Sequence, residues 1–355
     1  MGVCFVVSTV YQGYSAISLA KDILKKNCSK IYILDCTPGG DFSKKRGGWL
    51  DNLEIISLSG FYSKSFYIRC ILTRKIFLEL RSGILKDIDK LYIYNDRDPF
   101  SLYFAKQINQ SGGAVTLIEE GLSMYRQPIS FFSSQMIKDQ FKNFLFVLFS
   151  GSNLNFRFGF SYYVHEIMLG NPGEFKRRFP ENDKTLITYN VDFSDEDLNR
   201  LFMSVYVDSY VDGVYPCVDL KVFMYFGQPL SELGLVCEAD EMNLIKDVRS
   251  VAEKQGYKFI LKSHPKDRKG KYAELDLGLD FFDSIVPVEV FMRFYGVDVV
   301  GSFSSSASYG LSASGGVKSL VFSKMLGIDY NFPKQNKLFE VNSIEHLNSV
   351  FSEFK

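Results

Sequence analysis

The sequence predicts an α/β protein built from two Rossmann-like domains. Short β-branched runs alternate with segments of helical periodicity from the first residues onward. This alternation stops near the middle of the chain and then starts again. A length of 355 residues is comfortable for two domains, and a hydrophobic content of 46% supplies a core for each.

In the first half, apolar residues predict five strands and several helices. Helical spacing marks one apolar face around Ile17–Leu24, and a second helix is expected over residues 66–85. Asp98 and Pro99 have the pattern of an N-cap followed by proline at the first helical position. The expected strands are residues 3–7, 30–35, 53–58, 90–95 and 114–119. Strands that alternate with helices form βαβ units, so we expect a mostly parallel sheet.

The middle of the chain, residues 171–217, lacks this alternation, and we interpret it as the end of one domain and a linker. The second series is predicted as a strand from Val222, a helix at 239–255 that stops at Gly256, strands at 258–262, 297–300 and 319–322, and a terminal helix at 343–354. We therefore expect domains at residues 1–215 and 216–355. Two Rossmann-like domains that face a central cleft form the GT-B architecture, and ligands of such sheets bind at the carboxyl ends of strands.

Composition narrows the class of protein. Lys plus Arg equals Asp plus Glu at 41 each, which argues against a nucleic-acid binder. Six cysteines without CxxC spacing indicate neither a zinc site nor a disulfide framework. The longest apolar stretch, residues 144–149, is too short to span a bilayer, and no signal peptide is evident. We expect a cytoplasmic protein, either free or attached peripherally to the inner face of the membrane.

Two adjacent carboxylates, Glu119 and Glu120, follow the predicted strand at 114–119 and precede Gly121. Their mutual repulsion and partial burial can raise one pKa toward the working pH. Such a carboxylate can take a proton from an attacking sugar hydroxyl. The alternative is a solvated turn in which Gly121 supplies an unusual dihedral angle.

A second polar segment, Lys262-Ser263-His264-Pro265, follows another apolar strand. A histidine at a strand end can donate to a phosphate or protonate a leaving group near neutral pH. An ordinary polar loop is the alternative for this segment.

A third segment places Ser304, Ser305 and Ser306 after the strand at 297–300 and before a small-residue run. Hydroxyls and backbone N–H groups at a helix N-terminus suit a phosphate. A helix cap and flexible linker is the alternative. All three segments fall at predicted strand ends, and this joint arrangement is much harder to obtain by chance than each segment alone.

Two other motifs have ordinary structural interpretations that we favour. Asp96-Arg97-Asp98 matches the DxD spacing of metal-dependent glycosyltransferases, but Asp98 is already expected as an N-cap. The basic run Lys176–Arg178 lies between Phe175 and Phe179; contact with anionic lipid headgroups is the less favoured interpretation.

An acidic pair with glycine, a His-Pro pair and a serine run, in this order, resemble the shared motifs of bacterial sialyltransferases. The sequence most resembles glycosyltransferase family 52, the lipooligosaccharide sialyltransferases, and the poly-α2,8-sialyltransferase family is the near alternative. The segments that carry the resemblance are TVYQ (9–12), EEGLSMY (119–125), FGQPLSE (226–232), KSHPKD (262–267) and PVEVF (287–291). EEG departs from the commoner Glu-Asp-Gly, so which carboxylate is the base stays open.

The resemblance implies a role for each matching residue. Glu119 is expected to be the general base for the acceptor hydroxyl, with Glu120 as its support or substitute beside Gly121. His264 is expected to contact the phosphate of CMP and to stabilise or protonate it as it leaves. Gln12 is expected to line the acceptor side of the cleft. The residues expected around the donor are Gly227, Gln228, Pro229, Lys262, Pro265, Glu289, Ser304, Ser305 and Ser306, with Glu289 accepting hydrogen bonds from the ribose.

The implied reaction is a single inverting displacement that moves sialic acid from CMP-sialic acid to a glycan or glycolipid. CMP carries one phosphate, so no metal ion and no cofactor are expected. Relatives can be dimeric, which makes a homodimer one expectation. Two alternatives remain: a related GT-B enzyme with another nucleotide sugar, and a non-catalytic glycan-binding protein, which should have lost at least one motif.

Overall fold

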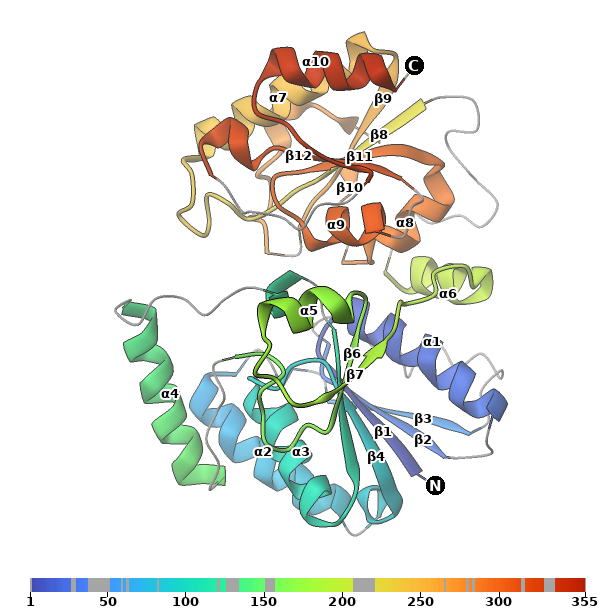
Figure 1. The fold of residues 1–355 in the computed structure, drawn as a ribbon, viewed down its shortest axis with the longest axis vertical. Coiled ribbons are helices and arrows are strands. Elements are labelled where there is room, and N and C mark those ends of the chain that lie inside the picture. Colours follow the sequence, from blue (N-terminus) through green and yellow to red (C-terminus); the bar gives the residue numbers. More distant parts are fainter. Residues whose placement is uncertain are drawn as a thin grey trace. The chain divides into compact units, whose positions relative to one another are not determined.

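The chain forms two compact units, Met1–Leu198 and Asn199–Lys355 (Figure 1). The computed structural model describes residues 2–26, 30–37, 52–58, 60–61, 64–81, 83–119, 122–125, 134–150, 157–206, 221–264, 266–278, 281–282, 285–313, 317–328 and 336–354. Each unit contains one parallel sheet, as the alternation of strands and helices predicts.

The sheet of the first unit has seven strands in the order β3-β2-β1-β4-β5-β6-β7. They are β1 (Gly2–Val7), β2 (Ile31–Asp35), β3 (Leu53–Ser57), β4 (Ile88–Ile93), β5 (Ala114–Ile118), β6 (Glu166–Leu169) and β7 (Thr185–Thr188). Every residue of β1 is buried, and Phe5 pairs with Ile33 on one side and Tyr92 on the other. A strand buried on both faces has a continuous apolar sequence, which explains why β1 was predictable.

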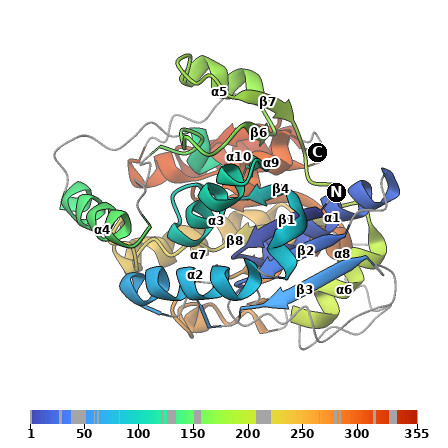
Figure 2. The ribbon, with the colours of Figure 1, turned by 90° about the horizontal axis from the view of Figure 1, so that it is seen from below.

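The helices of the first unit cover both faces of this sheet. They are α1 (Val10–Lys26), α2 (Phe66–Arg81), α3 (Pro99–Gln110), α4 (Ser134–Ser150) and α5 (Pro172–Arg178). Helix α1 lies on one face, and α2 and α3 lie on the other (Figures 1 and 2). The predicted start of α3 is confirmed, because Asp98 caps it by accepting from the N–H groups of Phe100 and Ser101 at 3.0 and 3.1 Å.

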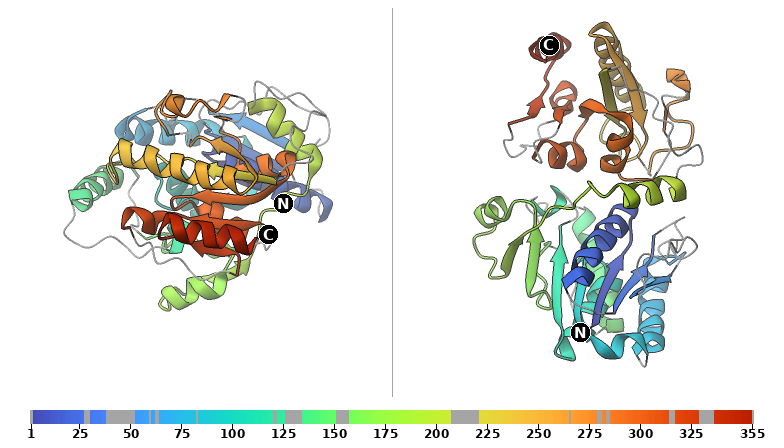
Figure 3. Two further views of the ribbon diagram at one scale, coloured as in Figure 1. Left: turned by 90° about the horizontal axis from the view of Figure 1, so that it is seen from above. Right: turned by 90° about the vertical axis from the view of Figure 1, so that its right-hand side faces the viewer.

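The sheet of the second unit has six strands in the order β10-β9-β8-β11-β12-β13. They are β8 (Lys221–Phe226), β9 (Tyr257–Lys262), β10 (Phe281–Phe282), β11 (Val297–Ser302), β12 (Lys318–Val321) and β13 (Leu338–Glu340). Helices α7 (Glu238–Lys254) and α10 (Ile344–Glu353) pack together on one face, while α8 (Val288–Tyr295) and α9 (Ser306–Ala313) lie on the other (Figures 1 and 3). Phe223 and Phe351 join strand and helix in the core.

Residues 171–217, interpreted as the end of a domain and a linker, include regular structure that the sequence analysis did not predict. This stretch contains α5, the sheet strand β7 and α6 (Glu196–Tyr206). A strand of four residues such as β7 is too short to show a clear alternation, and only its middle pair is even partly buried. The predicted boundary at residue 215 lies outside the described residues and stays a prediction.

Both sheets reverse their strand order next to their first strand. In the first unit the reversal lies between β1 and β4, and in the second it lies between β8 and β11. Open parallel sheets bind ligands at the carboxyl ends of the strands beside such a reversal. These two edges are therefore where the candidate residues have to be located.

Candidate active site

Glu119 follows β5 at the carboxyl edge of the first sheet. Its backbone N–H donates to the carbonyl of Met168 at 2.9 Å, which continues the pairing of β5 with β6. Its Oε2 atom accepts two hydrogen bonds, from the hydroxyl of Tyr125 and from the N–H of Gly170, both at 2.7 Å. The carboxylate is thus fixed through one oxygen. No described residue donates to the other oxygen, Oε1.

The surroundings of Glu119 favour a proton acceptor. Burial raises the pKa of Glu119 above its ordinary value, and the hydrogen bonds from Tyr125 and Gly170 oppose the rise. A carboxylate with a raised pKa holds a proton more strongly and is a better general base. Glu120 and Gly121 lie outside the described residues, so the choice between the two carboxylates rests on the geometry of Glu119 alone.

Tyr125 contacts the candidate base and was not predicted from the sequence. Its hydroxyl donates to Glu119 and also accepts from the N–H of Asn171 at 3.2 Å. Its carbonyl accepts from Arg178 at 3.0 Å, so the residue is held at both ends. EEGLSMY contains this tyrosine, but a spacing of six residues carries no signal that it turns back onto Glu119.

In the second unit, Gly227 lies at the carboxyl end of β8 and allows close approach of the neighbouring loop. Its N–H donates to the carbonyl of Lys262 at 2.8 Å. A Cβ atom at this position would lie 2.6 Å from the Tyr272 hydroxyl and 3.0 Å from a carboxylate oxygen of Asp267. Only glycine fits there without displacing these side chains.

His264 follows β9, the strand beside β8. Its Nδ1 accepts a hydrogen bond from the N–H of Lys266 at 3.1 Å, which places the proton of the neutral ring on Nε2. Burial lowers the pKa of His264; Asp267 opposes this, and the charges of Lys266 and Lys262 add to it. The ring is therefore a neutral N–H donor near neutral pH. Pro265 lies outside the described residues.

The serine segment follows β11, across the strand-order reversal from Gly227. The N–H of Ser304 donates to Oε1 of Gln228 at 2.6 Å, which joins two segments predicted to bind the donor. The N–H of Ser305 donates to the Ser302 hydroxyl at 3.0 Å. Ser306 is the first residue of α9, as predicted for a helix N-terminus. In this structure the N–H groups of Ser304 and Ser305 are thus satisfied by side chains of the protein.

Lys262 and Glu289 lie close enough to influence each other. Burial raises the pKa of Glu289, whereas its own backbone N–H and the charge of Lys262 lower it. The Lys262 ammonium lies 5.6 Å from the centre of the Phe291 ring on α8. Pro229 is buried, and its carbonyl accepts from the N–H of Leu233 at 3.0 Å, which shapes the loop after β8.

A buried lysine connects these loops and was not predicted. The side chain of Lys271 is 0% exposed and forms ion pairs with Glu232 and Glu241 at 2.8 Å and with Asp267 at 3.4 Å. It also donates to the carbonyl of Gln228 at 3.2 Å. We call these four charged residues the Lys271 cluster. Since its members span 40 residues of sequence from Glu232 to Lys271, no local pattern could reveal it.

Electrostatics keep Lys271 and Glu232 of this cluster ionised. Burial acts to lower the pKa of Lys271, but the hydrogen bonds that it donates to Glu232 and Glu241 outweigh burial, and the net pKa is raised. Partial burial acts to raise the pKa of Glu232, but the hydrogen bonds that it accepts from Lys271 and from the N–H of Arg268 lower this pKa to about 2. The cluster therefore joins the loop after β8, the loop after β9 and helix α7 of the second unit.

Gln12, the predicted acceptor-side residue of the first unit, is 2% exposed. Its Oε1 accepts from the N–H and the hydroxyl of Ser8, at 2.7 and 3.0 Å. The side chain closes the turn between β1 and α1, beside the strand-order reversal. Its contact with an acceptor stays a prediction.

The structural interpretation of Asp96-Arg97-Asp98 agrees with the contacts. Asp96 is fully buried and accepts from the N–H groups of Gly159 and Ser161 at 3.0 and 3.2 Å. Asp98 caps α3 and pairs with Arg69 at 3.5 Å. Both carboxylates therefore have defined structural contacts.

The lipid interpretation of Lys176–Arg178 is not supported by the structure. Phe175 and Phe179 are buried, so they offer no apolar surface. Arg177 pairs with Glu174 at 2.7 Å, Arg178 pairs with the same carboxylate, and Lys176 donates to the carbonyl of Asn182 at 2.6 Å. The basic run stabilises α5 and the turn that follows it.

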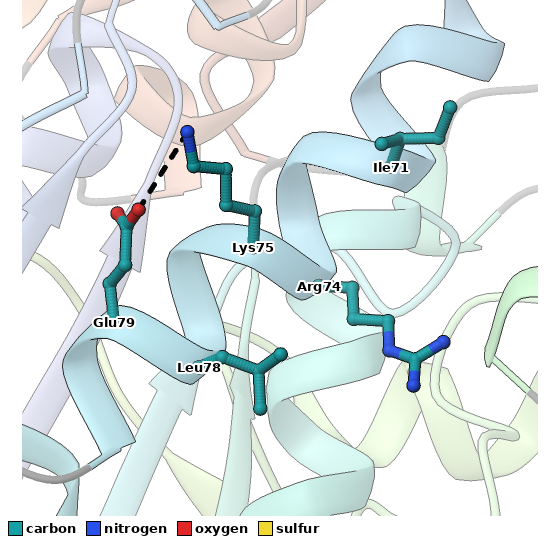
Figure 4. A pocket seen from close by; sticks show the side chains of 5 residues that line it. All are labelled: Ile71, Arg74, Lys75, Leu78 and Glu79. Atoms are coloured by element: carbon teal, nitrogen blue, oxygen red, sulfur yellow. Dashed lines mark ion pairs between the residues drawn. The ribbon is translucent and has the colours of Figure 1, made fainter.

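A hollow on the surface of α2 is separate from these residues (Figure 4). It is lined by Ile71, Arg74, Lys75, Leu78 and Glu79, all from that helix. Lys75 and Glu79 form an ion pair of 3.8 Å across one turn. None of these five side chains contacts Glu119 or its partners, and this hollow is not the candidate active site.

Comparison with protein families finds a match to this chain. The family model described as alpha-2,8-polysialyltransferase matches residues 68–307, more than half of the chain. The matched range includes Glu119, His264, Glu289 and the three serines, but not Gln12. A search of curated proteins finds no sequence that matches.

Solved structures resemble the chain over its whole length at low sequence identity. UDP-GlcNAc 2-epimerase from Methanocaldococcus jannaschii has a TM-score of 0.53 at 12% identity, with 100% of this chain and 92% of that chain covered. The UGT2 structure from Phytolacca americana with UDP-2fluoro-glucose and pterostilbene has a TM-score of 0.54 at 10% identity, with 99% and 89% covered. The S. aureus MnaA–UDP structure has a TM-score of 0.58 at 10% identity, with 99% and 87% covered. The predicted fold class, GT-B with two Rossmann-like domains, is confirmed.

Proposed function

Because the chain belongs to the alpha-2,8-polysialyltransferase family, we propose that it is a glycosyltransferase that moves sialic acid from CMP-sialic acid to a terminal sugar of a bacterial surface glycan. The family match over residues 68–307 is the observation that carries this proposal. It favours the polysialyltransferase family over the lipooligosaccharide sialyltransferases, which the sequence motifs alone do not separate.

Glu119 is the proposed general base. The oxygen of an acceptor hydroxyl attacks the anomeric carbon of sialic acid, and the hydroxyl proton passes to Oε1 of Glu119. Tyr125 and Gly170 hold the other oxygen at 2.7 Å and so fix the carboxylate while it accepts the proton. Positioned acid–base catalysis of this kind contributes roughly 10²- to 10⁴-fold in rate.

His264 is the proposed donor to the leaving phosphate. The bond between the anomeric carbon and the phosphate oxygen breaks, and its electron pair leaves with CMP. An Nε2–H donor at this oxygen stabilises the charge that develops there. Because burial keeps the ring neutral, we assign His264 hydrogen-bond donation rather than a standing positive charge. Inversion and metal independence are parts of the proposal.

The test is release of CMP from CMP-sialic acid by the purified protein, with a sialic-acid-terminated or lactose-type acceptor and EDTA present. We compare wild type with Glu119→Gln, Glu120→Gln and His264→Ala, and use His346→Ala as a matched control on α10. Release by wild type and the control, with large losses in His264→Ala and in one glutamate variant, is the expected result. CMP release by wild type that occurs without EDTA and is lost when EDTA is added would contradict metal independence.

The second candidate is a GT-B enzyme that uses another nucleotide sugar. The observation that favours it is the likeness to structures solved with UDP and UDP-2fluoro-glucose, although this likeness shows only the fold. Turnover of a UDP-sugar without turnover of CMP-sialic acid would overturn the sialyl assignment. Product length separates the remaining alternatives: a ladder of products indicates polymer growth, and a single addition indicates transfer of one residue.

A peripheral membrane contact is proposed for the outer face of α4. Phe146 of α4 is buried against Cys70 of α2, whereas Phe141, Phe144 and Leu148 are 62%, 58% and 65% exposed. Among the described residues, no helix has both the length and the apolar character needed to cross a membrane. Exposed Arg74 on the adjoining α2 adds positive charge. An apolar face with neighbouring positive charge suits an anionic lipid surface.

Sedimentation with vesicles of phosphatidylglycerol or of phosphatidylcholine tests this contact. We expect binding to the anionic vesicles, and its loss in a Phe144→Ser/Leu148→Ser variant. Leu233→Ser, which changes an exposed leucine of the second unit, is the matched control. A wild-type dimer that becomes monomeric in the α4 variant would instead identify a second copy of the chain as the occupant.

A further inference from the structure

Asp267 closes the turn that carries His264. Its backbone N–H donates to the His264 carbonyl at 2.9 Å, and its Oδ2 accepts from the His264 N–H at 2.6 Å. Both backbone groups of the histidine are thereby bound to one residue three positions later. Backbone movement at His264 therefore requires movement of Asp267.

Tyr272 and Lys271 hold the Asp267 carboxylate in place. The hydroxyl of Tyr272 donates to Oδ2 at 2.9 Å, and the ammonium of Lys271 pairs with Oδ1 at 3.4 Å. The Asp267 side chain is 3% exposed. A buried carboxylate with partners on both oxygens has a defined orientation, since losing any partner in a low-dielectric site is costly.

The turn determines which ring nitrogen of His264 carries the proton. Within it, the N–H of Lys266 points at Nδ1 of His264 at 3.1 Å, and an N–H group can only meet an unprotonated nitrogen. Protonation at Nδ1 would place two donors against each other. The remaining ring nitrogen, Nε2, carries the proton and has no partner of this kind in the turn.

We propose that Asp267 is a positioning residue for His264: it keeps the imidazole proton on Nε2 and holds that N–H in place for the phosphate of a nucleotide-sugar donor. The identity of the phosphate rests on the proposed function, but the positioning is measurable without any donor. The side chain acts through His264 and makes no contact with substrate in this proposal.

The experiment is ¹⁵N NMR of the imidazole rings in the ligand-free protein. With only three histidines, His165, His264 and His346, assignment needs one histidine variant for each of two signals. At pH values above the pKa of His264, the wild-type ring is expected to show an unprotonated, hydrogen-bonded Nδ1 and a protonated Nε2. A proton on Nδ1 of wild-type His264 would overturn the proposal without any variant.

Two substitutions of Asp267 separate positioning from charge. Asp267→Asn keeps an oxygen for the His264 N–H, so the tautomer should persist, while loss of the negative charge lowers the pKa of His264. Asp267→Ala removes the acceptor, and the Nδ1 signal should lose its hydrogen-bond shift. His165, whose Nδ1 accepts from the N–H of Val115 at 3.0 Å, is the unchanged reference in each spectrum. An unaltered Nδ1 signal in Asp267→Ala would refute the proposal.

Tyr272→Phe provides a milder variant should Asp267→Ala fold poorly. It removes only the hydroxyl bonded to Oδ2, and we expect partial broadening of the His264 ring signals. In turnover of CMP-sialic acid, Asp267→Ala should lower kcat about 10- to 100-fold, because a small misplacement of a catalytic group costs this much, and Asp267→Asn should recover most of it. Confirmed NMR behaviour without turnover would count against the proposed function and leave the positioning intact.

Discussion

The two candidate residues are held in different ways. In the first unit, Glu119 is bound by a phenol and a backbone amide, neither of which carries charge. In the second unit, the loops around His264 are tied to the Lys271 cluster, in which one cation meets three carboxylates. Burial raises the proton affinity of Glu119, and its two neutral partners lower it. The charged cluster instead fixes geometry, because each charge is buried only as long as its partners stay in place.

Burial moves both residues toward their neutral forms. The pKa of Glu119 is raised and that of His264 is lowered, with desolvation as the largest cause in each case. A carboxylate that binds a proton more strongly suits a base, and a neutral imidazole suits an N–H donor. The same physical effect thus supports the opposite roles proposed for Glu119 and His264.

The largest effect is expected for Glu119→Gln. It removes the proton acceptor but keeps an oxygen for Tyr125 and Gly170, so folding should be unchanged. We expect kcat to fall by roughly 10²- to 10⁴-fold in the CMP-release assay. Glu79→Gln, on the exposed surface of α2, is the control. A fall of this size in Glu120→Gln, with Glu119→Gln near wild type, would move the base to the neighbouring residue.

Lys271→Met should destabilise the second unit more than the first. Three carboxylates lose their cation, and breaking a buried ion pair in this way costs roughly 3–5 kcal/mol. Hydrogen exchange of amides in β8 and β9 should accelerate, while amides of β1 and β4 keep their protection. Lys271→Met combined with Glu241→Leu should recover part of the loss. Equal acceleration in both units would show that the cluster does not act within the second unit alone.

Asp96→Asn should change how the stability of the first unit depends on pH. Burial raises the pKa of Asp96 from 3.8 to about 6, so the folded state binds its proton more tightly than the unfolded chain. This contribution is complete below about pH 4 and is lost as pH rises through about 6. The shift corresponds to about 3 kcal/mol at about 1.36 kcal/mol per pKa unit.

Denaturant unfolding at pH 4 and at pH 8 measures this contribution. The unfolding free energy of Asp96→Asn minus that of wild type should be larger at pH 8 than at pH 4, by up to about 3 kcal/mol. The N–H groups of Gly159 and Ser161 keep an acceptor in the variant. A difference that is constant with pH would mean that Asp96 titrates normally.

The smallest effect is expected for Tyr125→Phe. Its hydroxyl lowers the pKa of Glu119, so its removal raises that pKa further. Because the ionised carboxylate is the active form, the acid limb of the kcat/KM profile should move to higher pH. A hydrogen bond to a charged group contributes roughly 1.5–3 kcal/mol, so the shift should be measurable, with little change on the alkaline side. An unmoved acid limb would assign that limb to another group.

The sequence predicts the strands that are buried on both faces and the residues directly after them. β1 is a continuous apolar run, β9 contains the apolar stretch Phe259–Leu261, and Glu119 and His264 stand at strand ends as expected. Short edge strands such as β7 escape prediction because four residues give no reliable period. The partners of the candidate residues also escape it. Tyr125 and Lys271 act through contacts that arise only when separate loops fold together, and nothing in their local sequence marks them.

The contact between Gln228 and Ser304 has a consequence for selectivity. The amide oxygen of Gln228 accepts a hydrogen bond from the N–H of Ser304 at 2.6 Å. Any anion that uses this N–H must first displace that oxygen, so its apparent affinity is reduced by the strength of the internal bond. A small anion that makes few other contacts gains too little binding free energy to displace the Gln228 oxygen. A large ligand that is held elsewhere at the same time can do so, and in the proposed donor site Gln228 would therefore compete with simple phosphate.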